Sequence, residues 1–88
     1  MKISIIIPTH NRVGLLHEAI DSVARLNLLS CEVIVCDDGS TEDIESICSI
    51  FHERGLNIVY SRTEENNGAQ VARNRGMKLA QGEFVLFL

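Results

Sequence analysis

Residues 31–40 read CEVIVCDDGS, an apolar run that ends in two aspartates, a glycine and a serine. An uninterrupted run of valine and isoleucine is typical of a strand that is buried on both faces of a parallel sheet. The stretch from Ile3 to Ile7 has the same character, and Pro8 is expected to end it. Two buried parallel strands are therefore the starting point for the fold.

Segments with helical spacing separate the strands. From Leu15 the apolar residues recur three and four positions apart, which predicts a helix with one buried face. A second helix is expected between Ser40, as its capping residue, and Gly55, as the left-handed residue after its end. A third helix is predicted from a cap at Asn67 to about Gln81. Small residues that allow a close approach to a neighbour lie along its inner face: Ala69, Ala72, Gly76 and Ala80.

Two further strands, Leu56–Ser61 and Glu83–Leu88, complete the pattern. The order β-α-β-α-β-α-β predicts an α/β fold with a Rossmann-like parallel sheet of about four strands and helices on both faces. The sequence stops within its last strand, so the sheet is expected to be truncated. Open sheets of this kind bind ligands beyond the carboxyl ends of their strands.

Composition and charge narrow the function classes. The 88 residues carry a net charge of −4 with scattered Lys and Arg, which disfavours nucleic-acid binding. No apolar run has the length of a membrane span, and no signal-peptide cleavage site follows the N-terminus, so a cytoplasmic location is expected. Three cysteines at spacings that match no common zinc pattern are interpreted as reduced core residues.

Polar residues cluster in three of the expected connections: 8–12, 37–40 and 66–68. The first lacks G-x-G-x-x-G, and no P-loop motif occurs, which argues against NAD and P-loop chemistry. An acidic pair after the second strand also fits a phospho-acceptor receiver domain poorly. An ionised aspartate only accepts hydrogen bonds, so Asp38 suits the imide N–H of uracil and matches the N1 acceptor of adenine poorly.

Four ordered blocks resemble the family 2 glycosyltransferases of the GT-A fold: IIIPTHNR at 5–12, VCDDGST at 35–41, NGAQVARNRG at 67–76 and AQGEF at 80–84. The resemblance implies a nucleotide-sugar donor, and a UDP-sugar fits the chemistry of Asp38. The nucleotide-binding residues that it implies are Pro8, Thr9, His10 and Asp38, with Asn11, Arg12 and Asp37 orienting the loops and Gly68 and Arg73 close to the donor.

The resemblance also implies what these residues lack. In the family a D-x-D motif follows the strand that ends here at Leu88, and it binds a divalent cation, Mn²⁺ or Mg²⁺. The catalytic base lies further on, so no catalytic residue and no metal ligand are expected within 1–88. Residues 1–88 are interpreted as the N-terminal, nucleotide-binding portion of an inverting glycosyltransferase. The sequence does not indicate which sugar is transferred or which acceptor receives it. By itself this portion is expected to bind a uridine nucleotide weakly and to transfer nothing.

Plainer interpretations stand beside these. The two aspartates can simply shape a turn, Asn11 can cap a helix, and Arg75 is expected to form surface ion pairs. A non-catalytic nucleotide-binding module and a flavodoxin-like protein-interaction domain are the alternative functions. The apolar edge of 83–88 also predicts self-association.

Overall fold

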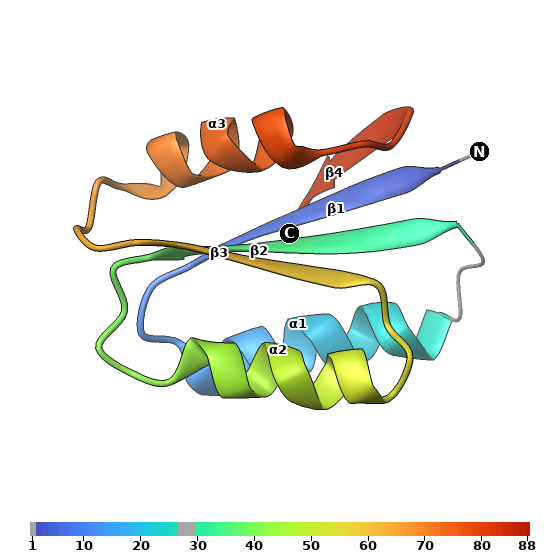
Figure 1. Ribbon diagram of the computed structural model, residues 1–88, viewed down its shortest axis with the longest axis horizontal. Helices are drawn as coiled ribbons and strands as arrows, with labels where there is room; N and C mark the ends of the chain where they lie inside the picture. Colours follow the sequence, from blue (N-terminus) through green and yellow to red (C-terminus); the bar gives the residue numbers. More distant parts are fainter. Residues whose placement is uncertain (1, 27–29) are drawn as a thin grey trace.

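The structure, a computed structural model, describes residues 2–26 and 30–88. Helices and strands alternate along the chain in the order β1 (Ile3–Thr9), α1 (Val13–Leu26), β2 (Cys31–Asp38), α2 (Ile44–Glu53), β3 (Ile58–Thr63), α3 (Ala69–Leu79) and β4 (Phe84–Phe87). The strands form one parallel sheet in the order β3-β2-β1-β4. Helices α1 and α2 cover one face and α3 covers the other (Figure 1). The predicted α/β architecture is confirmed.

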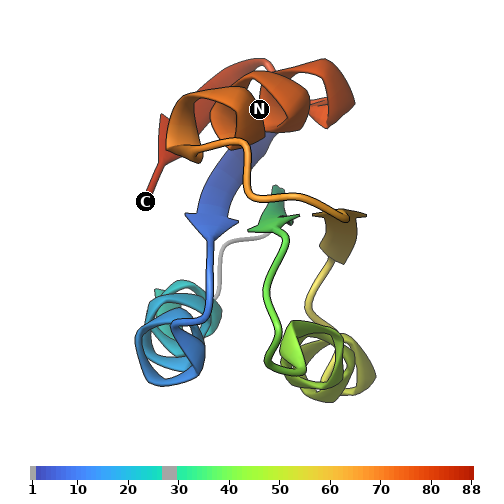
Figure 2. The ribbon, with the colours of Figure 1, turned by 90° about the vertical axis from the view of Figure 1, so that its left-hand side faces the viewer.

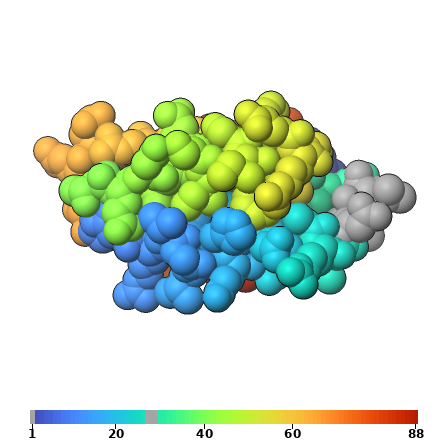
Figure 3. Space-filling view, turned by 90° about the horizontal axis from the view of Figure 1, so that it is seen from below, coloured from blue at the N-terminus to red at the C-terminus, as the bar shows by residue number. Residues whose placement is uncertain are grey.

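Alternation along the strands divides the core between the two faces. Val33 and Val35 belong to the larger apolar cluster beneath α1 and α2, whereas Ile34 and Cys36 belong to the smaller cluster beneath α3. Both faces of β2 are therefore buried, which explains its continuous apolar sequence. Seen from below, α1 and α2 lie side by side and together cover this face of the sheet (Figure 3).

Helix α3 lies close to the sheet because the residues on its inner face are small. Ala72 and Gly76 are buried, and a Cβ atom at Gly76 would lie only 2.5 Å from Cγ2 of Ile6. The predicted small inner face is confirmed at these two positions. Ala69 is exposed, because it stands at the first turn, where the helix leaves the sheet edge.

The structure corrects three of the expected boundaries. Pro8 lies inside β1 and does not end it, because β4 pairs with β1 only as far as Ile6 and no neighbouring strand on that side needs an N–H from residue 8. Helix α2 is capped by Asp43, whose carboxylate accepts the Ser46 N–H at 3.1 Å. Helix α3 begins after Gly68, one residue later than the predicted cap, and it ends at Leu79.

The cysteines behave largely as core residues. Cys36 and Cys48 are buried and Cys31 is half-buried, and all three are free thiols. Burial raises the pKa of the Cys48 thiol to about 12. Within the described ranges, none of the helices has the length and apolar character needed to cross a bilayer.

A buried polar cluster fixes the start of β4. Glu32, only 4% exposed, accepts hydrogen bonds from the Ser4 hydroxyl and from the Gln81 N–H at 2.7 Å. The Ser4 hydroxyl in turn accepts the Gly82 N–H at 2.8 Å. Burial opposes the charge of Glu32, but these hydrogen bonds outweigh it and hold the pKa of the carboxyl below its usual range. The turn between α3 and β4 is thereby tied to β1 and β2.

Candidate functional site

Three connections meet at the carboxyl edge of the sheet. They follow β1, follow β2 and join β3 to α3, and they lie at the same edge when the sheet is viewed end on (Figure 2). Gly39 allows two of them to touch, because a Cβ atom there would lie 2.8 Å from the backbone carbon of Glu65. The predicted meeting of the three polar segments is confirmed.

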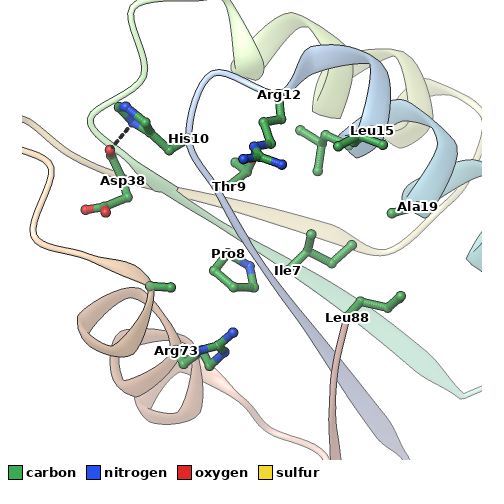
Figure 4. A pocket seen from close by; sticks show the side chains of 12 residues that line it. Ile7, Pro8, Thr9, His10, Arg12, Leu15, Ala19, Asp38, Arg73 and Leu88 are labelled. Carbon is green, nitrogen blue, oxygen red and sulfur yellow. Dashed lines mark hydrogen bonds between the residues drawn. The ribbon is translucent and has the colours of Figure 1, made fainter.

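A pocket of about 460 Å³ opens at this edge, beside the end of β1 that β4 does not reach (Figure 4). Its volume lies in the range typical of small-molecule sites. The lining residues are Ile7, Pro8, Thr9, His10, Arg12, Leu15, Leu16, Ala19, Asp38, Ala69, Arg73 and Leu88. Six of the nine predicted site residues line it. Asn11, Asp37 and Gly68 do not.

Asp38 is the carboxylate of the pocket. It is 4% exposed, and its two oxygens accept the backbone N–H groups of Asn67 and Gly68, each at 2.8 Å. These donors stand at the N-terminus of α3, where Gly68 has no side chain that could cap the helix. Asp38, at the end of β2, therefore holds the segment that leads into α3, and its carboxylate lies near the positive N-terminus of that helix. An ionised carboxylate has about four acceptor positions, so it can take further hydrogen bonds from a ligand.

Asp37 points to the opposite face of the sheet. It is fully buried and accepts hydrogen bonds from the Ser40 N–H at 3.0 Å and from the Tyr60 hydroxyl at 2.6 Å. Burial and this bond to Asp37 raise the pKa of Tyr60 well above its usual value. Arg62 lies 3.8 Å from the same carboxylate and donates to the Ser40 carbonyl at 3.0 Å. Asp37 thus holds the turn after β2, in agreement with the loop-orienting role that the resemblance implies.

His10 bridges the three connections. Its Nδ1 lies 2.8 Å from the carbonyl oxygen of Asp38, so this nitrogen carries the proton and donates (Figure 4). Its Nε2 lies 3.4 Å from the amide nitrogen of Asn66 and is left as the acceptor. The ring is exposed at the rim of the pocket. The imidazole therefore forms part of the surface that a ligand in the pocket would contact.

Asn11 joins the first two connections and lies outside the pocket. Its side-chain oxygen accepts the N–H groups of Thr41 at 2.8 Å and Glu42 at 3.1 Å, and its own N–H donates to the Ser40 hydroxyl at 2.9 Å. Its φ of 50° places it in the left-handed region, which asparagine tolerates better than most residues. Asn11 holds the loop on which His10 and Arg12 stand.

Two arginines supply positive charge to the pocket. Arg12, before α1, and Arg73, on α3, approach it from opposite sides of Pro8 (Figure 4). Both side chains are exposed, and neither forms an ion pair with a carboxylate in residues 2–26 and 30–88. Guanidinium groups bind phosphate and carboxylate oxygens through paired N–H donors, so the pocket can take an anionic ligand.

Some functional residues were missed or misjudged from the sequence. The apolar wall of the pocket comes from Leu15, Leu16 and Ala19, of which the sequence indicated only a buried helix face. Arg75 was expected to pair with acidic residues on the surface. Its guanidinium instead donates to the hydroxyl and the carbonyl of Ser61, each at 3.0 Å, and so fastens α3 to β3.

The described residues do not fit a metal centre. No group of three or more His, Cys, Asp or Glu side chains within 2–26 and 30–88 is arranged to hold an ion. The two carboxylates at the sheet edge are engaged by N–H and O–H donors instead. We therefore derive no chemistry through a cation from these residues.

The fold and the site together define a class, the α/β proteins with an open parallel sheet and a pocket at the carboxyl edge of that sheet. The sequence model of the family described as Glycosyl transferase family 2 matches residues 4–88, and the chain belongs to this family. An uncharacterized glycosyltransferase of Rickettsia felis is 40% identical over 87 residues, which cover 99% of this chain and 14% of that protein.

Solved structures agree in fold. TarS of S. aureus, residues 1–349, matches with a TM-score of 0.91 and 37% identity over 100% of this chain and 27% of that one. Its complex with UDP-GlcNAc matches with a TM-score of 0.87 and 36% identity, over 100% and 26% of the two chains. The mannosyltransferase PcManGT from Pyrobaculum calidifontis, in complex with GDP-Man and Mn²⁺, matches with a TM-score of 0.82 and 27% identity, over 96% and 26%. The chain thus spans only a small part of each of these proteins.

Proposed function

We propose that residues 1–88 form the part of an inverting glycosyltransferase that binds the nucleotide of a sugar donor, and that the donor is a UDP-sugar. The observation that carries the proposal is Asp38, a buried acceptor that lines the same pocket as two exposed arginines, Arg12 and Arg73. The family membership and the complexes of the two solved relatives support a nucleotide-sugar donor, and the UDP-GlcNAc complex of TarS supports a uridine nucleotide in particular.

The base would be recognised through its N–H group. Uracil carries N3–H and guanine carries N1–H, and both present a donor that an ionised carboxylate can accept, whereas adenine and cytosine present an acceptor at the corresponding position. Asp38 has acceptor positions left after it binds Asn67 and Gly68. His10 at the rim would cover one face of the base, and Arg12 and Arg73 would lie close to the phosphates.

Sugar transfer requires groups that the described residues do not supply. In an inverting reaction a base removes the proton of the acceptor hydroxyl, whose oxygen attacks the anomeric carbon as the bond to the nucleoside diphosphate breaks on the opposite side. We propose that this base and the ligands of a divalent cation belong to the portion of the relatives that residues 1–88 do not span. Residues 1–88 would then hold the donor nucleotide and leave the chemistry to that portion.

The test is a titration of the ¹⁵N-labelled 88-residue chain with UDP, CDP and ADP, followed by NMR. UDP is expected to shift the amide signals of residues that line the pocket at millimolar concentration. CDP and ADP should bind at least about tenfold more weakly, since mismatching a charged acceptor costs about 1.5–3 kcal/mol. Incubation with UDP-GlcNAc is expected to release no UDP. Equal binding of the three nucleotides would refute base recognition by Asp38. Hydrolysis of UDP-GlcNAc by the purified chain would refute the proposal that residues 1–88 bind the nucleotide but lack the groups that catalyse transfer.

A further inference from the structure

The hydrogen bonds that Asp38 accepts from the segment leading into α3 join two parts of the site that are far apart in the sequence. The donors are consecutive backbone N–H groups, at Asn67 and Gly68, and they reach the two oxygens of one carboxylate at 2.8 Å each. The Gly68 N–H also donates to the side-chain oxygen of Asn66 at 3.3 Å. Hydrogen bonds to the Asp38 carboxylate and within the segment thus hold residues 66–68 in place. The rotation of the Asp38 carboxylate is therefore fixed by backbone groups and not by another side chain.

Gly68 has the backbone conformation that makes this convergence possible. Its φ of 95° and ψ of 157° lie in a region that only glycine adopts readily. A Cβ atom at this position would meet no atom within 4 Å, so space is not what requires glycine here. Gly68 also lies outside the pocket lining, and its neighbour Asp38 is part of that lining. Glycine is thus required for its positive φ, which directs the N–H groups of Asn67 and Gly68 toward the Asp38 carboxylate.

We propose that Gly68 is a positioning residue for base recognition, and that it acts through Asp38. This inference rests on the proposed function. With both oxygens held from the α3 side, the acceptor positions that remain on the carboxylate are aimed into the pocket, where they favour a base with an N–H donor. A residue that does not readily adopt positive φ at position 68 turns the two N–H groups away from Asp38. The carboxylate is then free to rotate, and the preference for a base with an N–H donor decreases.

The test compares Gly68→Ala with Gly55→Ala. Gly55 is a matched control, because its φ is 96°, its Cβ position is equally open, and the loop after α2 lies at the opposite end of the sheet from the loop before α3 (Figure 1). Both variants are expected to lose stability through backbone strain. Only Gly68→Ala is expected to lower the preference for UDP over CDP, by about tenfold, the loss that accompanies misalignment of a charged hydrogen bond.

A mirror-image residue provides the rescue. Gly68 is replaced by D-alanine, which adopts positive φ readily, in a chain assembled by ligation of residues 1–47 to residues 48–88 at Cys48. This chain is expected to recover the UDP preference and, at positions 67 and 68, amide signals typical of N–H groups bound to the Asp38 carboxylate. An L-alanine variant that keeps the UDP preference, or a D-alanine chain that fails to recover it, would overturn the inference while leaving the proposed function intact. Absence of nucleotide binding by the unaltered chain would overturn both.

Discussion

The two adjacent aspartates offer a test in which the same substitution is made on opposite faces of one strand. Asp38→Asn places an amide NH₂ where one carboxylate oxygen now accepts a backbone N–H at 2.8 Å. One of the two N–H groups at the start of α3 then loses its partner, which costs about 1–3 kcal/mol. For a chain of this size, each kcal/mol corresponds to a decrease of about 4–8 °C in the melting temperature.

The substitution should also change which base is bound. An asparagine amide donates where the carboxylate accepts, so it suits the N3 acceptor of cytosine and opposes the N3–H of uracil. We expect the UDP to CDP affinity ratio to fall by about tenfold or more, and CDP to bind as well as UDP or better, since about 1.4 kcal/mol corresponds to a factor of ten. The ratio is measured by NMR titration below the melting temperature of each variant.

Asp37→Asn is the control. Asp37 is fully buried and its carboxylate accepts from the Tyr60 hydroxyl and the Ser40 N–H, so the asparagine variant should lose about as much stability as Asp38→Asn. Its side chain lies on the α1 and α2 side of the sheet and does not line the pocket, so the UDP to CDP ratio should stay at the wild-type value. Equal changes of the ratio in the two variants, or no change in either, would refute the assignment of base recognition to Asp38.

Three further predictions concern the core and the edge of the sheet. Glu32 has a pKa held below its usual range, so its ionised form stabilises the fold above the pKa of the unfolded chain, and this contribution is lost as the pH falls through the folded pKa. Glu32→Gln should therefore lower the stability measured by urea denaturation at pH 7 by about 1–3 kcal/mol, and the difference from wild type should shrink toward pH 3; a difference that is independent of pH would contradict this. Gly76→Val should cost about 3 kcal/mol or unfold the chain, because its Cβ would meet Ile6 at 2.5 Å, and a circular dichroism melt equal to that of wild type would refute the packing argument. Phe84 and Leu86 on β4 are 53% and 54% exposed, so the chain should associate through this edge as its concentration rises, and Leu86→Lys should keep it monomeric; sedimentation that does not change with concentration in the wild type would exclude this association.

The sequence by itself determined the order of helices and strands and the edge at which the site forms. Runs of β-branched residues such as Val33 to Val35 indicate buried strands, and the parallel order places the ends of β1 and β2 side by side. These features depend on neighbouring residues in the sequence, and local patterns are sufficient to predict them.

Only the tertiary structure decided how the polar groups are partnered. The carboxylate that holds the segment before α3 belongs to Asp38, some thirty positions earlier in the sequence. Nothing in the local sequence around Asn67 and Gly68 shows that a carboxylate from another strand will be present. In the same way, Arg75 reaches Ser61 on β3 from α3, which packs on the neighbouring strands β1 and β2, although its sequence neighbours suggested a surface ion pair. Hydrogen bonds between distant segments depend on where the packed core brings their backbones together, and this is settled by the fold as a whole.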